Sequence, residues 1–255
     1  MNNNQPLISI ITINRNNADG LRKTMQSVLS QTFDNYEYII IDGASTDSSV
    51  EVIKSFVEDP KYADKIGYWV SETDGGIYNA MNKGIMKSHG EWINFMNSGD
   101  SLYNEETLSN VAENITDKDN VIYGITYDYN NQVRSDIQIN KLKLLQGNMV
   151  CHQSIFARRN TFDNNMFDTS YKIIADKIWL CRCYNGKSVR QIRIPVCYYE
   201  DTGVSSNTDK LQAESQKFLP NAFGLQGRLI LFWDWLWHLP IRCFTKMCRL
   251  LRGKT

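Results

Sequence analysis

The chain has 255 residues, 42% of them hydrophobic, and its 28 basic residues equal its 28 acidic ones. This length can bury a sizeable core, and the charge balance provides no overall positive field that would favour nucleic acid. The six cysteines form no C-x-x-C pair, which argues against a metal or redox centre and favours reduced, packed thiols.

Short apolar runs alternate with helical patterns through the first hundred residues. The runs at 7–13, 38–41, 66–70 and 91–96 predict strands. Apolar residues at helical spacing predict helices over about 21–29, 50–57 and 77–85. The capping-box signature Ser48-x-x-Glu51 predicts the start of the second of these helices. Such alternation predicts βαβ units and a parallel sheet.

The pattern is less regular beyond residue 115. We expect strands over 120–129, 154–158 and 189–199, a turn at Asn130 and Asn131, and helices over 141–146 and 173–183. Without an internal repeat or a low-complexity linker, residues 1–206 are predicted to form one catalytic domain and residues 207–255 a C-terminal helical extension.

Polar clusters follow each of the four early strands, at residues 14–17, 42–47, 72–74 and 97–100. Ligands of parallel α/β sheets bind at the carboxyl ends of strands, so these clusters predict a shared site. The chain has no G-x-x-x-x-G-K-[ST] loop, no G-x-G-x-x-G fingerprint, no H-E-x-x-H pair and no nucleophile elbow. These absences argue against P-loop phosphoryl transfer and dinucleotide-dependent redox chemistry.

Four segments in this order, ISIITINRN, IIIDGASTDSS, SETDGGIYNAMNKGI and GEWINFMNSGD, resemble the family 2 glycosyltransferases. The likeness is strong over residues 6–110 and looser over 148–206, and it is greatest to the branch acting in bacterial exopolysaccharide and capsule assembly, the colanic-acid type. It implies a GT-A fold, an α/β architecture with a Rossmann-like, mostly parallel central sheet flanked by helices. It also implies inverting transfer of a sugar from a nucleotide-diphosphate donor to a saccharide or lipid-linked saccharide acceptor in cell-surface polysaccharide biosynthesis.

The resemblance assigns the donor side of the site to the early strand ends. Thr12, Asn14 and Arg15 match the loop that lines the nucleotide pocket. Asp42 matches the residue that accepts hydrogen bonds from the nucleobase or ribose. The alternative is that it is a structural aspartate in a turn. Asp74 heads the segment facing the donor, and the alternative is a helix cap.

The segment from Asn97 to Asp100 stands where the family has its D-x-D metal motif. Mg²⁺ or Mn²⁺ would neutralise the charge that develops on a diphosphate leaving group, and Asp100 is the predicted metal ligand. Asn97 departs from the acidic form of the motif and could offer only a neutral oxygen. Weak metal affinity, or a carbonyl or water in place of the missing carboxylate, is therefore expected.

The acceptor side is assigned to the later part of the chain. Asp176 matches the catalytic aspartate of the family, which takes the acceptor's proton, and a helix-terminal acid is the alternative. His152 and Gln153 match a His-Gln pair near the acceptor, and His152 could equally be structural. Gly203 and Ser205 lie in a segment that resembles a closing flap over the donor.

The stretch from 229 to 251 carries tryptophans on one side of a helical wheel and mostly basic residues on the other. It is too often interrupted by charge to span a bilayer, and it predicts a helix lying in an anionic membrane interface, with packing on the catalytic domain or in a dimer as the alternative. Since no secretory signal is expected, the predicted location is cytoplasmic, on the inner face of the plasma membrane. A sugar-phosphate nucleotidyltransferase and a non-catalytic nucleotide-sugar-binding subunit remain alternative functions.

Overall fold

The computed structural model describes residues 5–140, 143–144, 150–184, 188–200 and 214. Its strands are β1 (Ile8–Asn14), β2 (Tyr36–Asp42), β3 (Ile66–Ser71), β4 (Trp92–Phe95), β5 (Ser101–Leu102), β6 (Val121–Asp128), β7 (Val133–Ser135), β8 (Ile155–Arg158) and β9 (Val189–Tyr199). Its α-helices are α1 (Ala18–Leu29), α2 (Ser49–Val57), α3 (Ile77–Lys87), α4 (Thr107–Asn114) and α6 (Ala175–Cys183). The predicted strands and helices that fall on described residues are present, whereas β5, β7 and α4 were not anticipated.

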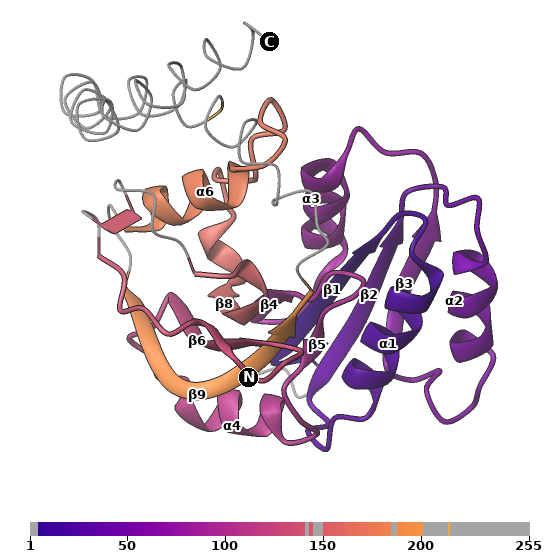
Figure 1. Ribbon diagram of the computed structural model, residues 1–255, viewed down its shortest axis with the longest axis horizontal. Helices are drawn as coiled ribbons and strands as arrows, with labels where there is room; N and C mark the ends of the chain where they lie inside the picture. Colours follow the sequence, from indigo (N-terminus) through magenta and orange to yellow (C-terminus); the bar gives the residue numbers. More distant parts are fainter. Residues whose placement is uncertain (1–4, 141–142, 145–149, 185–187, 201–213, 215–255) are drawn as a thin grey trace, which may run out of the picture.

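One sheet runs through the molecule in the order β3-β2-β1-β4-β8-β6-β9-β5, with β7 paired to β6. Strands β1 to β4 are mutually parallel, and β8 begins a portion that contains antiparallel pairs. Helices lie on both faces of the curled sheet (Figure 1). The expected α/β architecture, a central sheet flanked by helices, is confirmed.

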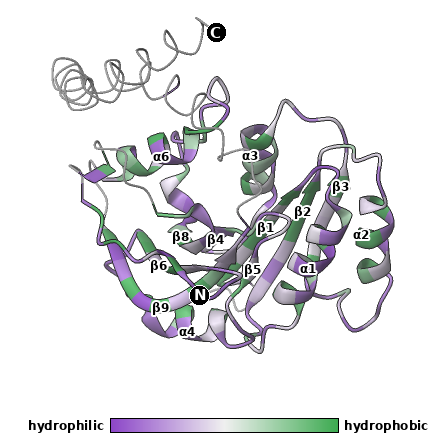
Figure 2. Cartoon of the chain, in the orientation of Figure 1, coloured by the Kyte–Doolittle hydropathy of each residue, from purple (hydrophilic) through white to green (hydrophobic). Residues whose placement is uncertain are grey.

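Alternating residues of β1 explain why this strand is apolar throughout. Ile8 and Ile10 pack with α1 and α2 in one buried cluster, and Ile11 and Ile13 pack with α3 and α6 in the other. Figure 2 shows hydrophobic green stretches along β1 and β2 and mixed colours on the helices beside them. A strand covered on both faces needs apolar side chains on both, which produces a continuous run in place of alternation.

The parallel and antiparallel portions meet where β4 pairs with β8. Asn94, a fully buried polar residue within β4, donates from Nδ2 to the carbonyl oxygens of Gln153 at 2.8 Å and Ile155 at 2.9 Å. A buried amide is stable only when it is hydrogen-bonded, so Asn94 fixes the backbone of residues 153–155 beside β4. This holds the 3₁₀ turn His152–Ser154 near the end of that strand.

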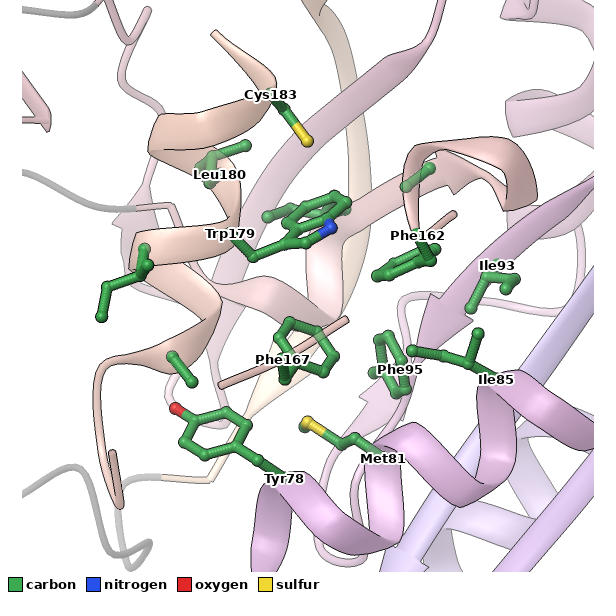
Figure 3. Close-up of a cluster of buried hydrophobic side chains, with 14 of the residues drawn as sticks. Tyr78, Met81, Ile85, Ile93, Phe95, Phe162, Phe167, Trp179, Leu180 and Cys183 are labelled. Carbon is green, nitrogen blue, oxygen red and sulfur yellow. The ribbon is translucent and has the colours of Figure 1, made fainter. Parts of the chain in front are cut away.

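An aromatic cluster packs α6 against the sheet (Figure 3). The rings of Phe162 and Trp179 are stacked with centroids 4.7 Å apart, and Phe167 lies 5.4 Å from Phe95 and 5.5 Å from Tyr78. Each such side chain contributes about 1.5–3 kcal/mol through burial. The cluster ties α6 to α3 and β4, and it thereby sets where the first turn of α6 lies.

One local expectation needs correction, and two others fall outside the described residues. Ser48 is the N-cap of α2, but its side chain makes no capping bond; Asp47 does so in its place, accepting the N–H of Ser49 at 3.0 Å. The helix expected over 141–146 and the extension from 207 onward lie outside the described residues, apart from positions 143, 144 and 214. No helix within the described part of the chain is long and apolar enough to cross a membrane.

Candidate active site

A cavity of about 810 Å³ lies at the carboxyl ends of β1 and β4, bounded by α3, α6 and the end of β9. Eight of the residues singled out in the sequence line it: Asn14, Arg15, Asp74, Asn97, Asp100, His152, Gln153 and Asp176. They come from five separate stretches of chain. The sheet therefore brings the predicted donor and acceptor residues to one place.

Asp176 lies in the first turn of α6 and has hydrogen-bond partners on both carboxylate oxygens. Oδ2 lies 3.3 Å from Nδ1 of His152, while Oδ1 accepts the backbone N–H of Lys177 at 2.9 Å and lies 3.0 Å from the Tyr78 hydroxyl. That hydroxyl lies 2.7 Å from the carbonyl oxygen of Ile173, so its single proton is shared between the carbonyl and the carboxylate. These contacts aim the carboxylate while leaving it on the cavity wall.

Two opposing effects act on the pKa of Asp176. Burial alone would raise it, but the hydrogen bond from His152, the charge that this ring carries when protonated, the Lys177 N–H and the Tyr78 hydroxyl act in the other direction and lower it. Burial and the nearby carboxylate also raise the pKa of Tyr78, so this phenol stays protonated and remains a donor. Asp176 is accordingly an oriented, ionised carboxylate at neutral pH.

Asp100 follows β4 and is only 4% exposed. Its Oδ2 accepts from Nε2 of Gln153 at 2.7 Å, and its Oδ1 accepts the backbone N–H of Glu200 at 2.9 Å. Burial raises the pKa of Asp100 to about 6 despite these bonds, and the Glu200 carboxylate adds to the rise. The protein thus holds an acid here in a setting that disfavours its charge.

Thr12 and Asp42 lie outside the cavity lining. The Thr12 hydroxyl lies 2.8 Å from that of Tyr38 and donates to the carbonyl of Met96 at 2.7 Å. Asp42 accepts from Asn14, Ser45 and Ser71, which occupy both of its oxygens. Thr12 could therefore serve the site only indirectly, and Asp42 could reach a nucleobase only by releasing a present donor.

The remaining predicted residues divide between the cavity and the undescribed part of the chain. Asp74 lines the cavity and also accepts the N–H of Gly76, the N-cap residue of α3, at 2.8 Å, so its position is compatible with a donor contact and with a role at the start of α3. Gly203 and Ser205 lie outside the described residues. No cluster of three or more His, Cys, Asp or Glu residues within the described ranges is arranged to hold a metal ion.

Sequence reasoning gave no role to several cavity residues, among them Tyr78 and Glu200. Tyr78 is not one of the apolar positions that predicted α3, and its contact with Asp176 spans 98 positions. Glu200 lines the cavity at the end of β9, and its carboxylate lies over Gly99, whose φ of 105° suits a residue without a side chain. A side chain at position 99 would collide with that carboxylate.

The carboxylate of Glu214 binds the backbone of the segment that precedes α6. Glu214 accepts the N–H groups of Lys172 at 2.6 Å, Ile173 at 2.9 Å and Ile174 at 3.2 Å. A negative charge is stabilising at a helix N-terminus.

We expect Glu214→Gln to lower the free energy of unfolding by about 1 kcal/mol in urea denaturation. Glu113→Gln, an exposed change in the last turn of α4, is the control and should not destabilise; equal stability of both variants would contradict this role.

The comparisons with known proteins agree with this geometry. The family described as Glycosyl transferase family 2 matches residues 9–187. A PGL/p-HBAD biosynthesis glycosyltransferase of Mycobacterium tuberculosis is 30% identical over 231 residues, covering 89% of each chain. An uncharacterized glycosyltransferase of the same species is 32% identical over 212 residues, covering 80% of this chain and 79% of that one.

Solved structures show the same fold at low identity. TarS 1–349 of S. aureus in complex with UDP-GlcNAc has a TM-score of 0.67 at 18% identity, covering 88% of this chain and 70% of that chain. The mannosyltransferase PcManGT of Pyrobaculum calidifontis, in complex with GDP-Man and Mn²⁺, has a TM-score of 0.66 at 15% identity, covering 85% and 63%. On the strength of the family match and the relatives, this chain belongs to glycosyl transferase family 2.

Proposed function

We propose that this protein is an inverting glycosyltransferase that moves a sugar from a nucleotide-diphosphate donor onto a saccharide or lipid-linked saccharide acceptor. The observation that carries the proposal is the meeting of Asp100 and Asp176 in one cavity although 76 positions separate them. The two carboxylates differ in setting, since the pKa of Asp100 is raised and that of Asp176 lowered. Separated roles on donor and acceptor follow from that difference.

On the donor side, the Asn14–Asn17 loop and Asp100 line the part of the cavity that we assign to the nucleotide diphosphate. Asp100 and Glu200 offer two carboxylates close together, and oxygen-only donors of this charge suit Mg²⁺ or Mn²⁺. A divalent ion held there would neutralise charge on the departing diphosphate. The like charge of Glu200 contributes to the raised pKa of Asp100, so a cation would relieve an existing repulsion.

On the acceptor side, Asp176 takes the proton of the attacking hydroxyl. Inverting transfer needs a base on the face of the sugar opposite the leaving group, and we assign this role to the carboxylate that α6 holds on the cavity wall. Its bonds from His152, Lys177 and Tyr78 hold it ready without solvent reorganisation. Asp42 positions Asn14, since its carboxylate accepts a hydrogen bond from Nδ2 of Asn14 at 2.7 Å.

The cell-surface setting is supported by the sequence resemblance to exopolysaccharide and capsule enzymes and by the name of the mycobacterial relatives, which refers to PGL/p-HBAD biosynthesis. TarS with UDP-GlcNAc and PcManGT with GDP-Man illustrate the donor class in proteins of the same fold. For this chain, a UDP-, GDP- or dTDP-sugar is the donor to be tested.

A donor panel tests the function. Purified protein is incubated with each nucleotide sugar, with Mn²⁺ or with EDTA, and the nucleotide product is identified. We expect nucleoside diphosphate, increased by Mn²⁺ and by a saccharide acceptor, and a product with the opposite anomeric configuration. Pyrophosphate release would indicate a nucleotidyltransferase, and the absence of turnover with every donor and acceptor would favour a non-catalytic subunit.

The C-terminal stretch, which lies outside the described residues, is proposed to hold the enzyme at an anionic membrane surface. Removing residues from Leu229 onward should shift the protein from the membrane fraction to the supernatant, because the tryptophans and basic residues of this stretch are lost. Binding to vesicles with and without anionic lipid measures the effect directly. Unchanged fractionation and unchanged vesicle binding would contradict the proposal.

A further inference from the structure

Asn97 stands where the metal motif has an acid, yet its amide bonds to a histidine. Its Nδ2 lies 2.9 Å from Nε2 of His152, and Nδ1 of the same ring lies 3.3 Å from Oδ2 of Asp176. The three side chains come from the end of β4, the turn before β8 and the first turn of α6. They form a continuous chain from the donor side of the cavity to the proposed base.

The hydrogen-bonding properties of Asp176 and Asn97 determine which nitrogen of the His152 ring carries the proton. Asp176 is an ionised carboxylate and only accepts, so the proton in that contact is on Nδ1 of His152. In the neutral ring Nε2 is then bare, and it accepts from the amide N–H of Asn97. The contact of Nδ2 with His152 is the hydrogen bond that the structure gives this amide, since Oδ1 of Asn97 is buried and has no partner within the described residues.

We propose that Asn97 is a positioning residue that holds His152 as the neutral Nδ1–H tautomer, so that the ring orients Asp176 without placing a full positive charge beside it. The inference rests on the proposed role of Asp176 as base. A charge-assisted hydrogen bond is about twice as strong as a neutral one, so an imidazolium would hold the Asp176 lone pair more tightly and weaken it as a base. An amide at position 97 avoids this, whereas a carboxylate would accept from Nε2–H and favour the imidazolium.

Nitrogen NMR of the imidazoles tests the tautomer independently of activity. The sequence has only three histidines, His89, His152 and His238, so the protein labelled with ¹⁵N-histidine gives few signals, and His152→Gln assigns the one of interest. At pH 7.5 we expect a protonated Nδ1 and a bare Nε2 in the wild type, and two protonated nitrogens in Asn97→Asp. The control Asn16→Asp adds the same charge to the same cavity and retains the oxygen that accepts from Thr46, so it should leave His152 as in the wild type.

The kinetics of Asn97→Asp complete the test. Although Asn97→Asp restores the acid of the metal motif, we expect kcat to fall about tenfold, with KM for the donor nearly unchanged. A protonated Nε2 in the wild type, or a singly protonated ring in Asn97→Asp, would overturn the inference while leaving the transferase proposal intact. A rise in kcat and in Mn²⁺ affinity would also overturn it, because Asn97 would then be a weakened metal position. Wild-type protein without turnover on any donor would instead refute the proposed function.

Discussion

Replacing Asp176 by asparagine is expected to lower kcat by about 10²–10⁴-fold, the range that a general base contributes. The amide keeps an oxygen to accept from Lys177 and Tyr78, so the first turn of α6 should remain in place. It cannot take a proton from the acceptor hydroxyl. Donor affinity should change by less than about threefold, since the donor side of the cavity is untouched.

Single-turnover kinetics and isothermal titration with a donor or with the nucleoside diphosphate separate these two effects. Asp168→Asn is a matched control, because Asp168 is a nearby acid whose carboxylate bonds to Ser170 and does not line the cavity. It should retain wild-type turnover. A fully active Asp176→Asn would remove Asp176 from the mechanism, and a large loss of donor affinity would place it on the donor instead.

Replacing Asp100 by asparagine is expected to abolish most activity and yet stabilise the fold at neutral pH. The amide oxygen would accept the Glu200 N–H as the carboxylate does. Oε1 of Gln153 is buried without a partner within the described residues, so a flip of the Gln153 amide would let it accept from the new N–H group. The flip exchanges one unpaired Gln153 group, Oε1, for another, Nε2, so the substitution removes a buried charge without increasing the number of unpaired groups on Gln153.

The sign of the pH dependence follows from the raised pKa. Because folding raises the pKa of Asp100 from its ordinary 3.8 to about 6, the wild type loses stability relative to Asp100→Asn as the pH rises through that interval. At pH 7.5 the variant should be more stable by about 1–3 kcal/mol, and the difference should vanish below about pH 4. Urea denaturation at several pH values measures it. A less stable variant at pH 7.5 would show that burial of this charge costs little.

The early half of the site could be predicted because two signals coincide there. Continuous apolar runs mark strands covered on both faces, and the polar residues that follow them, such as Asn14 and Asp100, must then lie at one edge of the sheet. What the sequence does not distinguish is whether a strand-end carboxylate faces the cavity or its supporting wall. Asp42 and Asp100 have similar local patterns, but Asp42 accepts four hydrogen bonds away from the cavity, whereas Asp100 accepts one on each oxygen and lines the cavity.

Contacts across the fold were beyond sequence reasoning for a physical reason. Tyr78 looks like any other position of an amphipathic helix until α6 is packed by the aromatic cluster around Phe167 and Trp179. The helix α4 has a weak pattern, with Leu108 and Val111 as its fully buried apolar residues. Asn94 did carry a signal, since a polar residue inside an apolar strand must find a buried partner, but its partners lie about sixty positions later.

The junction of β4 with β8 has a consequence for how such enzymes diversify. The cavity lining before residue 101 includes the proposed donor side and the lining after residue 149 includes the proposed base, and Asn94 is one of the contacts that join the two stretches. Exchange of the later stretch by recombination could therefore change the acceptor specificity of an enzyme while its donor specificity stays the same. Such hybrids would be expected to be active only when the new segment places two backbone carbonyl oxygens where Asn94 can donate to them.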